Sequence, residues 1–340
     1  MSASYEVSNV KPITIFSSYM LLAITLTSFI IRRLIQSSPT SIRPKNDTFK
    51  IILFSILAII SLGTTWFYML EFFKYSYRLW AERRDIKLPE SFQAGLLSIG
   101  SNDKHSLRLG SWLKDSKLFK EAWGTALETP LRQWWTQQIF FFAALLSLLM
   151  SYEVHISHAW AFVLLGQLVA ISFASNLFFL AVLVKSESSK SRSKIKTKDF
   201  LEEKPVDPSW IVSFIFQGIP LIFTLVCVVL IPYVQETQYF LPVLLVPHAV
   251  LFIPPLLPQL VKGSSSVFQR DNTNRKALLE TIFVLSFTFL QITATTKSVD
   301  NWRFEPIWQT LYEHPAVSSV GWDVIMCTIS YTLWTLVGKS

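Results

Sequence analysis

Long apolar runs with few or no charges recur along this chain, and they limit what it can fold into. Most are about 17 to 25 residues long, the length that an α-helix needs to cross about 30 Å of hydrocarbon. Charged residues make up only 16% of the 340 residues, against about 25% in soluble domains. The sequence therefore predicts an all-α fold, a polytopic integral membrane bundle of about eight transmembrane helices in one domain that covers residues 1–340.

Polar loops separate the eight expected spans. The sixth span is irregular because its prolines each remove a backbone donor and bend a helix, so we expect it to be broken. The expected spans are 13–31, 50–72, 134–151, 159–184, 210–233, 239–260, 277–296 and 320–337.

The 31 Lys and Arg residues are divided unequally between the two sides of such a bundle. With eight spans, 24 of them fall on the side that holds both termini and the loops 73–133, 185–209 and 261–276, and 7 fall on the other side. Because basic loops stay in the cytoplasm, both termini are expected there, in a multi-pass protein of the endoplasmic reticulum. Asn46 begins a glycosylation sequon in a loop that is expected in the lumen.

Two expected cytoplasmic segments differ in character. Segment 185–209 is rich in Ser and Lys without apolar periodicity, which predicts a flexible linker near anionic headgroups. The loop 73–133 carries apolar and aromatic residues among its charges, and residues 112–123 have the spacing of an amphipathic helix that lies on the membrane. This helix is expected to be an ordered lid or an interfacial anchor, and a surface helix without a catalytic part is the alternative.

Known catalytic and metal-binding motifs are absent from the sequence. It contains no P-loop, HExxH, GxSxG or DDxxD pattern, so no cofactor is expected. The net charge of +8 comes from the loops, and no nucleic-acid partner is expected. Cys227 and Cys327 lie in apolar runs and are expected to pack there. Glu153, His155 and His158 resemble metal ligands, but their loop is short and no metal site is expected.

Polar residues within apolar runs, or at the ends of these runs, are costly to bury and are therefore functional candidates. Most are expected in the cytoplasmic half of the bundle, where they would line a pocket. The alternatives are structural, because acids can end helices at the headgroups, amides can link helices, and a histidine can bind carbonyls freed by prolines. The candidates are Glu71, Gln137, Gln138, Asn176, His248 and Glu280. Gln167 and Gln217 are expected to link helices, as Asn176 also can, and Asp323 is expected at the membrane interface.

Aromatic residues make up 14% of the chain, with 27 Phe, 12 Trp and 10 Tyr. Phe-rich runs at 139–144 and 176–180 lie beside the polar candidates, and aromatic faces stabilise positive charge. An aromatic pocket that holds one protonated carboxylic acid suits carbocation chemistry, because burial keeps the proton on a carboxyl group. Ordinary core packing would produce the same runs.

Two stretches of the chain carry a family resemblance. They are WLKDSKLFKEAWGTALETPLRQWWTQQIFFFAA (112–144) and AFVLLGQLVAISFASNLFFLAVLV (161–184). Over about 110–185, the chain resembles a family of fungal integral membrane proteins whose best-known members are the membrane-bound terpene cyclases of the ascochlorin and ascofuranone pathways.

The resemblance implies a metal-independent cyclisation in fungal meroterpenoid biosynthesis. An acid would protonate the terminal epoxide of a prenyl chain on an aromatic or polyketide head, and the polyene would then cyclise through carbocations. The lipophilic prenylated substrate and the membrane lipids are the expected partners. The expected acids are Glu71, Glu280 and Glu121, in that order, and the expected substrate-binding residues are Gln138, Asn176, His248 and Trp135.

Two other functions are compatible with the same residues. Proline-broken helices and polar groups within spans also describe transporters of small molecules or lipids, although no internal repeat relates the two halves of this chain. A non-catalytic membrane scaffold is the third alternative.

Overall fold

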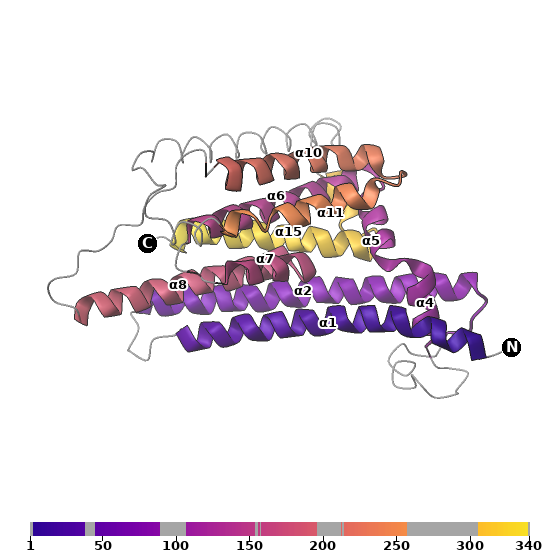
Figure 1. The fold of residues 1–340 in the computed structure, drawn as a ribbon, viewed down its shortest axis with the longest axis horizontal. Coiled ribbons are helices and arrows are strands. Elements are labelled where there is room, and N and C mark those ends of the chain that lie inside the picture. Colours follow the sequence, from indigo (N-terminus) through magenta and orange to yellow (C-terminus); the bar gives the residue numbers. More distant parts are fainter. Residues whose placement is uncertain are drawn as a thin grey trace.

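The structure is a computed structural model, which describes residues 3–37, 45–88, 107–153, 156, 158–195, 212, 214–256 and 305–338, with the backbone alone for 3–9, 45–46 and 186–195. Every regular element in these residues is a helix. The long helices lie side by side along one axis of the molecule (Figure 1). The all-α prediction is therefore confirmed for this part of the chain.

Five helices of the described residues are long and apolar enough to cross a membrane. They coincide with the predicted spans 13–31, 50–72, 134–151, 210–233 and 320–337. The predicted span 277–296 lies outside the described residues, so that eight spans are not confirmed. The five are α1 (Ala3–Ser37), α2 (Lys45–Arg83), α6 (Pro130–Tyr152), α10 (Ile219–Val234) with the preceding π-helical turn η1 (Phe214–Gly218), and α15 (Pro315–Leu333) with the following π-helical turn η4 (Trp334–Gly338).

The predicted span 239–260 is broken, as its prolines indicated. It contains α11 (Phe240–Val250) and, after a turn, the 3₁₀-helix η2 (Pro254–Leu256). At 1.5 Å per residue, the 11 residues of α11 reach only about 16 Å, which is too short to cross a bilayer alone.

The predicted span 159–184 is wrong, because this segment is a hairpin of two helices. Helix α7 (Ala159–Leu168) stops, and α8 (Ile171–Ile195) begins after two residues. The rings of Phe162 and Phe178 lie 5.9 Å apart, whereas one continuous helix would separate their backbones by about 24 Å. The two helices are therefore antiparallel. Hydropathy could not show the reversal, because the segment is apolar on both sides of it.

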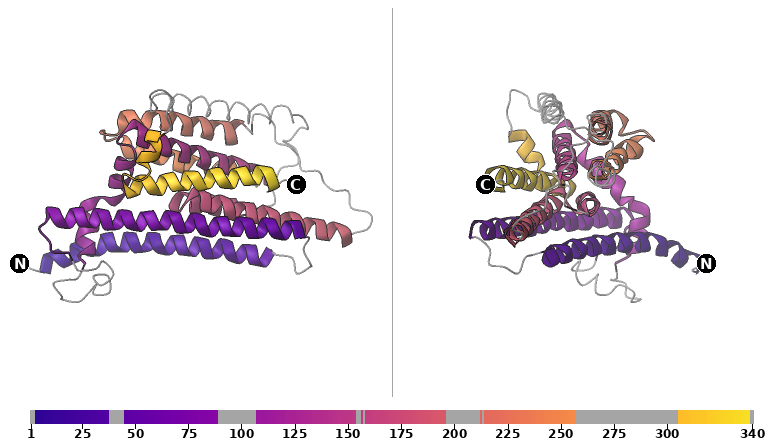
Figure 2. Two further views of the ribbon diagram at one scale, coloured as in Figure 1. Left: turned by 180° about the vertical axis from the view of Figure 1, so that it is seen from behind. Right: turned by 60° about the vertical axis from the view of Figure 1, so that its left-hand side comes forward.

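The hairpin also bears on the predicted orientation of the two ends of the chain. Because the chain reverses there, α8 runs to the end of the bundle opposite α4 (Leu109–Ser116) and α5 (Leu118–Ala126) (Figures 1 and 2). The loop 73–133, with 11 Lys and Arg, and the segment 185–209, with 7, therefore start from opposite ends. The start of α1 and the end of η4 also lie at opposite ends. This arrangement does not support two cytoplasmic termini.

Helix α15 packs against α2, α6 and α8. Gly321 allows the side chains of Leu311 and Trp135 to approach the backbone of α15 closely. A Cβ atom at this position would come within 2.2 Å of Leu311 Cδ1 and 3.3 Å of Trp135 Cδ2. At the other end, the Trp334 ring stacks on Phe179 of α8 at 4.5 Å. The first contact positions α15 against α6, and the second positions η4 against α8.

His314 caps the first turn of α15. Its Nδ1 accepts a hydrogen bond from the Ala316 N–H at 3.1 Å, and the residue is 9% exposed. Beside it, Arg132 donates to Glu128 at 2.5 Å and to Glu313 at 3.0 Å. Burial lowers the pKa of His314 and Arg132 lowers it further, while Glu128 acts in the opposite direction. The cap therefore needs the neutral imidazole.

Acidification should destabilise the protein through His314. An unfolded histidine titrates near pH 6.5, and the folded pKa is lower, so the unfolded state binds more protons in the window below about pH 6.5. We expect the melting temperature to fall as the pH drops from 7.5 to 5.5. Thermal unfolding of His314→Asn should depend less on pH, because asparagine caps helices without titrating. An equal pH response of both proteins would contradict this account.

Candidate functional site

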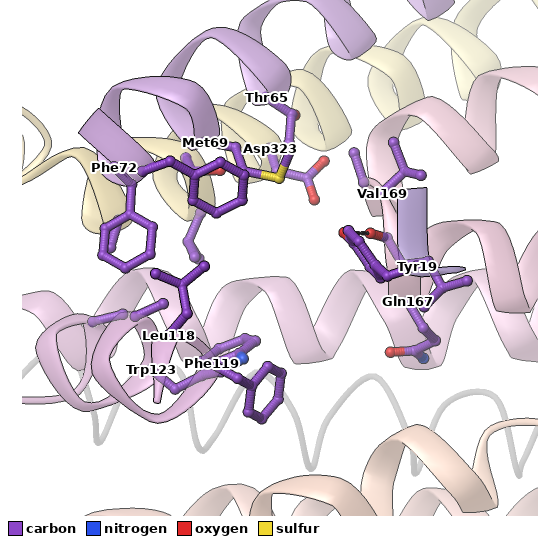
Figure 3. A pocket seen from close by; sticks show the side chains of 18 of the residues that line it. Tyr19, Thr65, Met69, Phe72, Leu118, Phe119, Trp123, Gln167, Val169 and Asp323 are labelled. Carbon is purple, nitrogen blue, oxygen red and sulfur yellow. Dashed lines mark hydrogen bonds between the residues drawn. The ribbon is translucent and has the colours of Figure 1, made fainter. Parts of the chain in front are cut away.

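A cavity of about 760 Å³ lies between the helices, within the range of roughly 300–1,000 Å³ that holds drug-sized molecules. Helices α1, α2, α4, α5, α6, α11 and α15 contribute to its walls, and so does the tip of the α7–α8 hairpin. Figure 3 shows side chains from these elements around the open space.

Most of the cavity wall is apolar, and much of it is aromatic. The rings come from four helices, so they surround the space rather than form one stripe. They are Phe16 and Tyr19 of α1, Phe72 and Phe73 of α2, Phe119 and Trp123 of α5, and Phe140 of α6. Such a wall suits a lipophilic ligand and would stabilise positive charge inside it.

Asp323 of α15 is the only carboxylic acid among the described residues that line the cavity. It is 6% exposed. Its two oxygens accept hydrogen bonds from the backbone N–H groups of Ile171 at 2.9 Å and Ser172 at 2.8 Å. These groups begin α8, so Asp323 caps the start of this helix. The prediction that Asp323 lies at the membrane interface is wrong.

No sequence signal identified this role of Asp323. The carboxyl group and the N–H groups that it binds are about 150 residues apart in the chain, and the local pattern around Asp323 has no capping motif. The N–H groups at the start of α8 need an outside acceptor because α7 ends two residues earlier.

A second contact holds the hairpin tip. The Tyr19 hydroxyl on α1 donates a hydrogen bond to the Leu168 carbonyl at the end of α7 (Figure 3). Gln167 lies beside this contact and lines the cavity, although the sequence predicted a residue that only links helices. The tip is thus bound from both sides, by α1 and by α15.

His248 is the one predicted substrate-binding residue that lines the cavity. Its ring makes edge contacts with Phe140 at 5.4 Å and Trp123 at 6.3 Å. Its Nδ1 lies 2.9 Å from the Leu244 carbonyl. Because a carbonyl can only accept, Nδ1 carries the proton of the neutral ring and Nε2 is left as an acceptor.

The two predicted acids within the described residues, Glu71 and Glu121, do not line the cavity. Glu71 forms an ion pair with Lys74 at 2.6 Å, and about 38% of its side chain is exposed. Glu121 of α5 accepts a hydrogen bond from the Ser76 hydroxyl at 2.7 Å. Glu280 lies outside the described residues. The predicted meeting of Glu71, Gln138, Asn176 and Glu280 at one pocket is therefore not found in this part of the chain.

The other predicted substrate-binding residues are buried away from the cavity. Trp135 is 2% exposed and donates from Nε1 to Thr310 Oγ1 at 3.1 Å. Gln138 is buried in α6. Asn176 donates from Nδ2 to the Ser172 carbonyl at 2.9 Å and to Ser61 Oγ at 3.3 Å, within the bundle. Gln217 of η1 links helices, as predicted, through a 2.8 Å bond to Ser151 Oγ.

The segment 112–123 covers one side of the cavity, but it is not one continuous helix. The left-handed backbone of Lys117 (φ 47°) separates α4 from α5, and both helices contribute lining residues. Two indole contacts bind α4 to α2, from Trp112 Nε1 to Ser76 Oγ at 3.1 Å and from Trp80 Nε1 to Asp115 at 3.0 Å. The segment is therefore an ordered part of the wall.

The remaining predicted sites are placed as follows. Cys227 and Cys327 are free and buried, as expected for packing residues. His155 lies outside the described residues, and no three His, Cys, Asp or Glu side chains elsewhere in the described chain are grouped to hold a metal. Asn46 lies in the first turn of α2, and its glycosylation stays a prediction.

Comparison with known proteins gives no relative for this chain. No family model, no curated protein and no solved structure matches it.

Proposed function

We propose that this protein is a membrane-bound terpene cyclase whose substrate occupies the cavity. The family resemblance of residues 112–144 and 161–184 supports the reaction class. The observation that carries the proposal is the aromatic and apolar wall of the 760 Å³ cavity, with few polar groups among its lining residues. A prenylated aromatic molecule is lipophilic, and it would reach this cavity from the membrane.

The proposed reaction is an isomerisation that starts and ends with a proton. An acid protonates the epoxide oxygen, the C–O bond opens, and the carbocation is attacked by successive double bonds of the same chain. Loss of a proton from carbon then ends the cascade. The rings around the cavity stabilise the cation while it exists.

His248 is the proposed acceptor of the final proton, because its Nε2 is unprotonated and the residue lines the cavity. Asp323 is a poor choice for the first acid, since both of its oxygens already accept backbone hydrogen bonds. Glu280 keeps the expected role of the acid. Under this proposal, Asp323 positions the hairpin tip that forms one wall.

Conversion of an epoxidised prenyl-aryl compound tests the proposal. Microsomes that contain the protein are expected to form a cyclic product of unchanged mass, and Glu280→Gln should abolish it. Glu71→Gln should retain turnover, because Glu71 is paired with Lys74 outside the cavity. Immunoblotting of each variant controls for expression. If no such epoxide is cyclised by the wild-type protein, the proposed function is wrong.

One structural feature favours transport as a second candidate. The α7–α8 hairpin places two helix ends in the interior of the bundle, beside the cavity and a buried carboxylate, and transporters use discontinuous helices in this way. Uptake of a lipophilic compound into sealed proteoliposomes, without chemical conversion, would support the transporter instead of the cyclase.

A further inference from the structure

Three buried oxygen atoms at the interface of α2 and α8 have no hydrogen-bond partner among the described residues. They are Thr65 Oγ1, Ser172 Oγ and Asn176 Oδ1. Thr65 is 4% exposed, and the two α8 residues are fully buried. Because buried polar atoms without partners are costly, a cluster of them indicates a bound water or ion.

Helix register brings these atoms together. Asn176 Nδ2 lies 3.3 Å from Ser61 Oγ, which aligns α8 with α2. The two helices run in opposite directions (Figure 1). One turn along α2 from Ser61 is Thr65, and one turn back along α8 from Asn176 is Ser172. Thr65 and Ser172 therefore lie at the next level of the same interface.

The orientation of the Asn176 amide is fixed by its neighbours. Its nitrogen donates to the Ser172 carbonyl at 2.9 Å, and a carbonyl can only accept, so that the amide cannot be turned around. Its oxygen is therefore a buried acceptor without a hydrogen-bond partner among the described residues.

Asp323 adds a carboxyl group beside Ser172. Its carboxylate binds the N–H of Ser172, the residue whose hydroxyl belongs to the cluster. Thr65 and Asp323 both line the cavity (Figure 3). Among the described residues, no Lys or Arg forms an ion pair with Asp323. A positive charge nearby would stabilise a carboxylate buried in this way.

We propose that Thr65, Ser172, Asn176 and Asp323 form a binding site for one monovalent cation of the size of Na⁺. Hydroxyl, amide and carboxylate oxygens are the ligands that hard cations prefer. One carboxylate matches one positive charge, and no three acidic, His or Cys side chains of the described chain gather to hold a divalent metal. The bound cation joins α2, α8 and α15 at the hairpin tip. The site is independent of the proposed cyclisation.

Thermal unfolding of the purified full-length protein in detergent tests the cation site. NaCl is varied while choline chloride keeps the ionic strength constant. Because a cation that binds only the folded state stabilises it, the melting temperature should rise with Na⁺ to a plateau, by at least about 3 °C. Thr65→Val should move the midpoint of this response at least about tenfold higher in Na⁺.

Thr65→Val keeps the shape of the side chain and removes a hydroxyl group without a partner, so it should fold. Thr64→Val is the matched control, because the Thr64 hydroxyl already donates to the Ile60 carbonyl at 2.9 Å. It should respond to Na⁺ like the wild type. A melting temperature that depends on pH but not on Na⁺, or equal responses of the two variants, would overturn the proposal.

Discussion

Replacement of Asp323 by leucine is expected to destabilise the protein more than any other single change to the cavity wall. The substitution leaves the N–H groups of Ile171 and Ser172 buried without acceptors, at a cost of about 1–3 kcal/mol for each. Of the two hydrogen-bonding contacts described at the tip of the hairpin, the one from Tyr19 then remains. Thermal unfolding in detergent should show a much lower melting temperature, or no folded protein at all.

Asp323→Asn provides the graded comparison. Asparagine keeps one acceptor oxygen of similar reach, so it should retain part of the lost stability. If leucine and asparagine at this position both melt like the wild-type protein, then the carboxylate does not hold the hairpin, and α8 must be stabilised in another way.

Replacement of His248 by phenylalanine should have the largest effect on turnover among the cavity residues. Phenylalanine retains the edge contacts with Phe140 and Trp123 but removes the nitrogen that we propose as the proton acceptor. General bases contribute about 10²- to 10⁴-fold to a rate, so kcat should fall by about this factor. Chromatography of the cyclic product measures the change.

His158→Phe is the matched control for this experiment. His158 lies before α7, packs at the edge of the Phe29 ring, and does not line the cavity, so its replacement should leave kcat unchanged. Equal rates for His248→Phe and the wild type would remove His248 from the proposed mechanism without affecting the description of the cavity.

Most of the polar residues that the sequence predicted for the site do not line the cavity. Glu71 was a candidate because it ends an apolar run, yet a lysine three residues later pairs with it. Trp135 and Asn176 are bound within the helix interfaces. His248 and residues of the segment 112–123 line the cavity, whereas the substrate-binding role of His248 stays a prediction.

Local chemistry in the sequence determined which segments are helical and which are apolar enough for a membrane. Five predicted spans are long helices for this reason, and α11, which contains Pro247, ends at Val250, ahead of Pro254 and Pro255. Hydropathy depends on composition and is unaffected by the direction of the chain. Only the tertiary structure decided that 159–184 reverses, since the reversal depends on contacts such as Phe162 with Phe178 and on the distant carboxylate of Asp323. These contacts join residues that the chain separates by up to about 150 positions, so no local pattern could contain them.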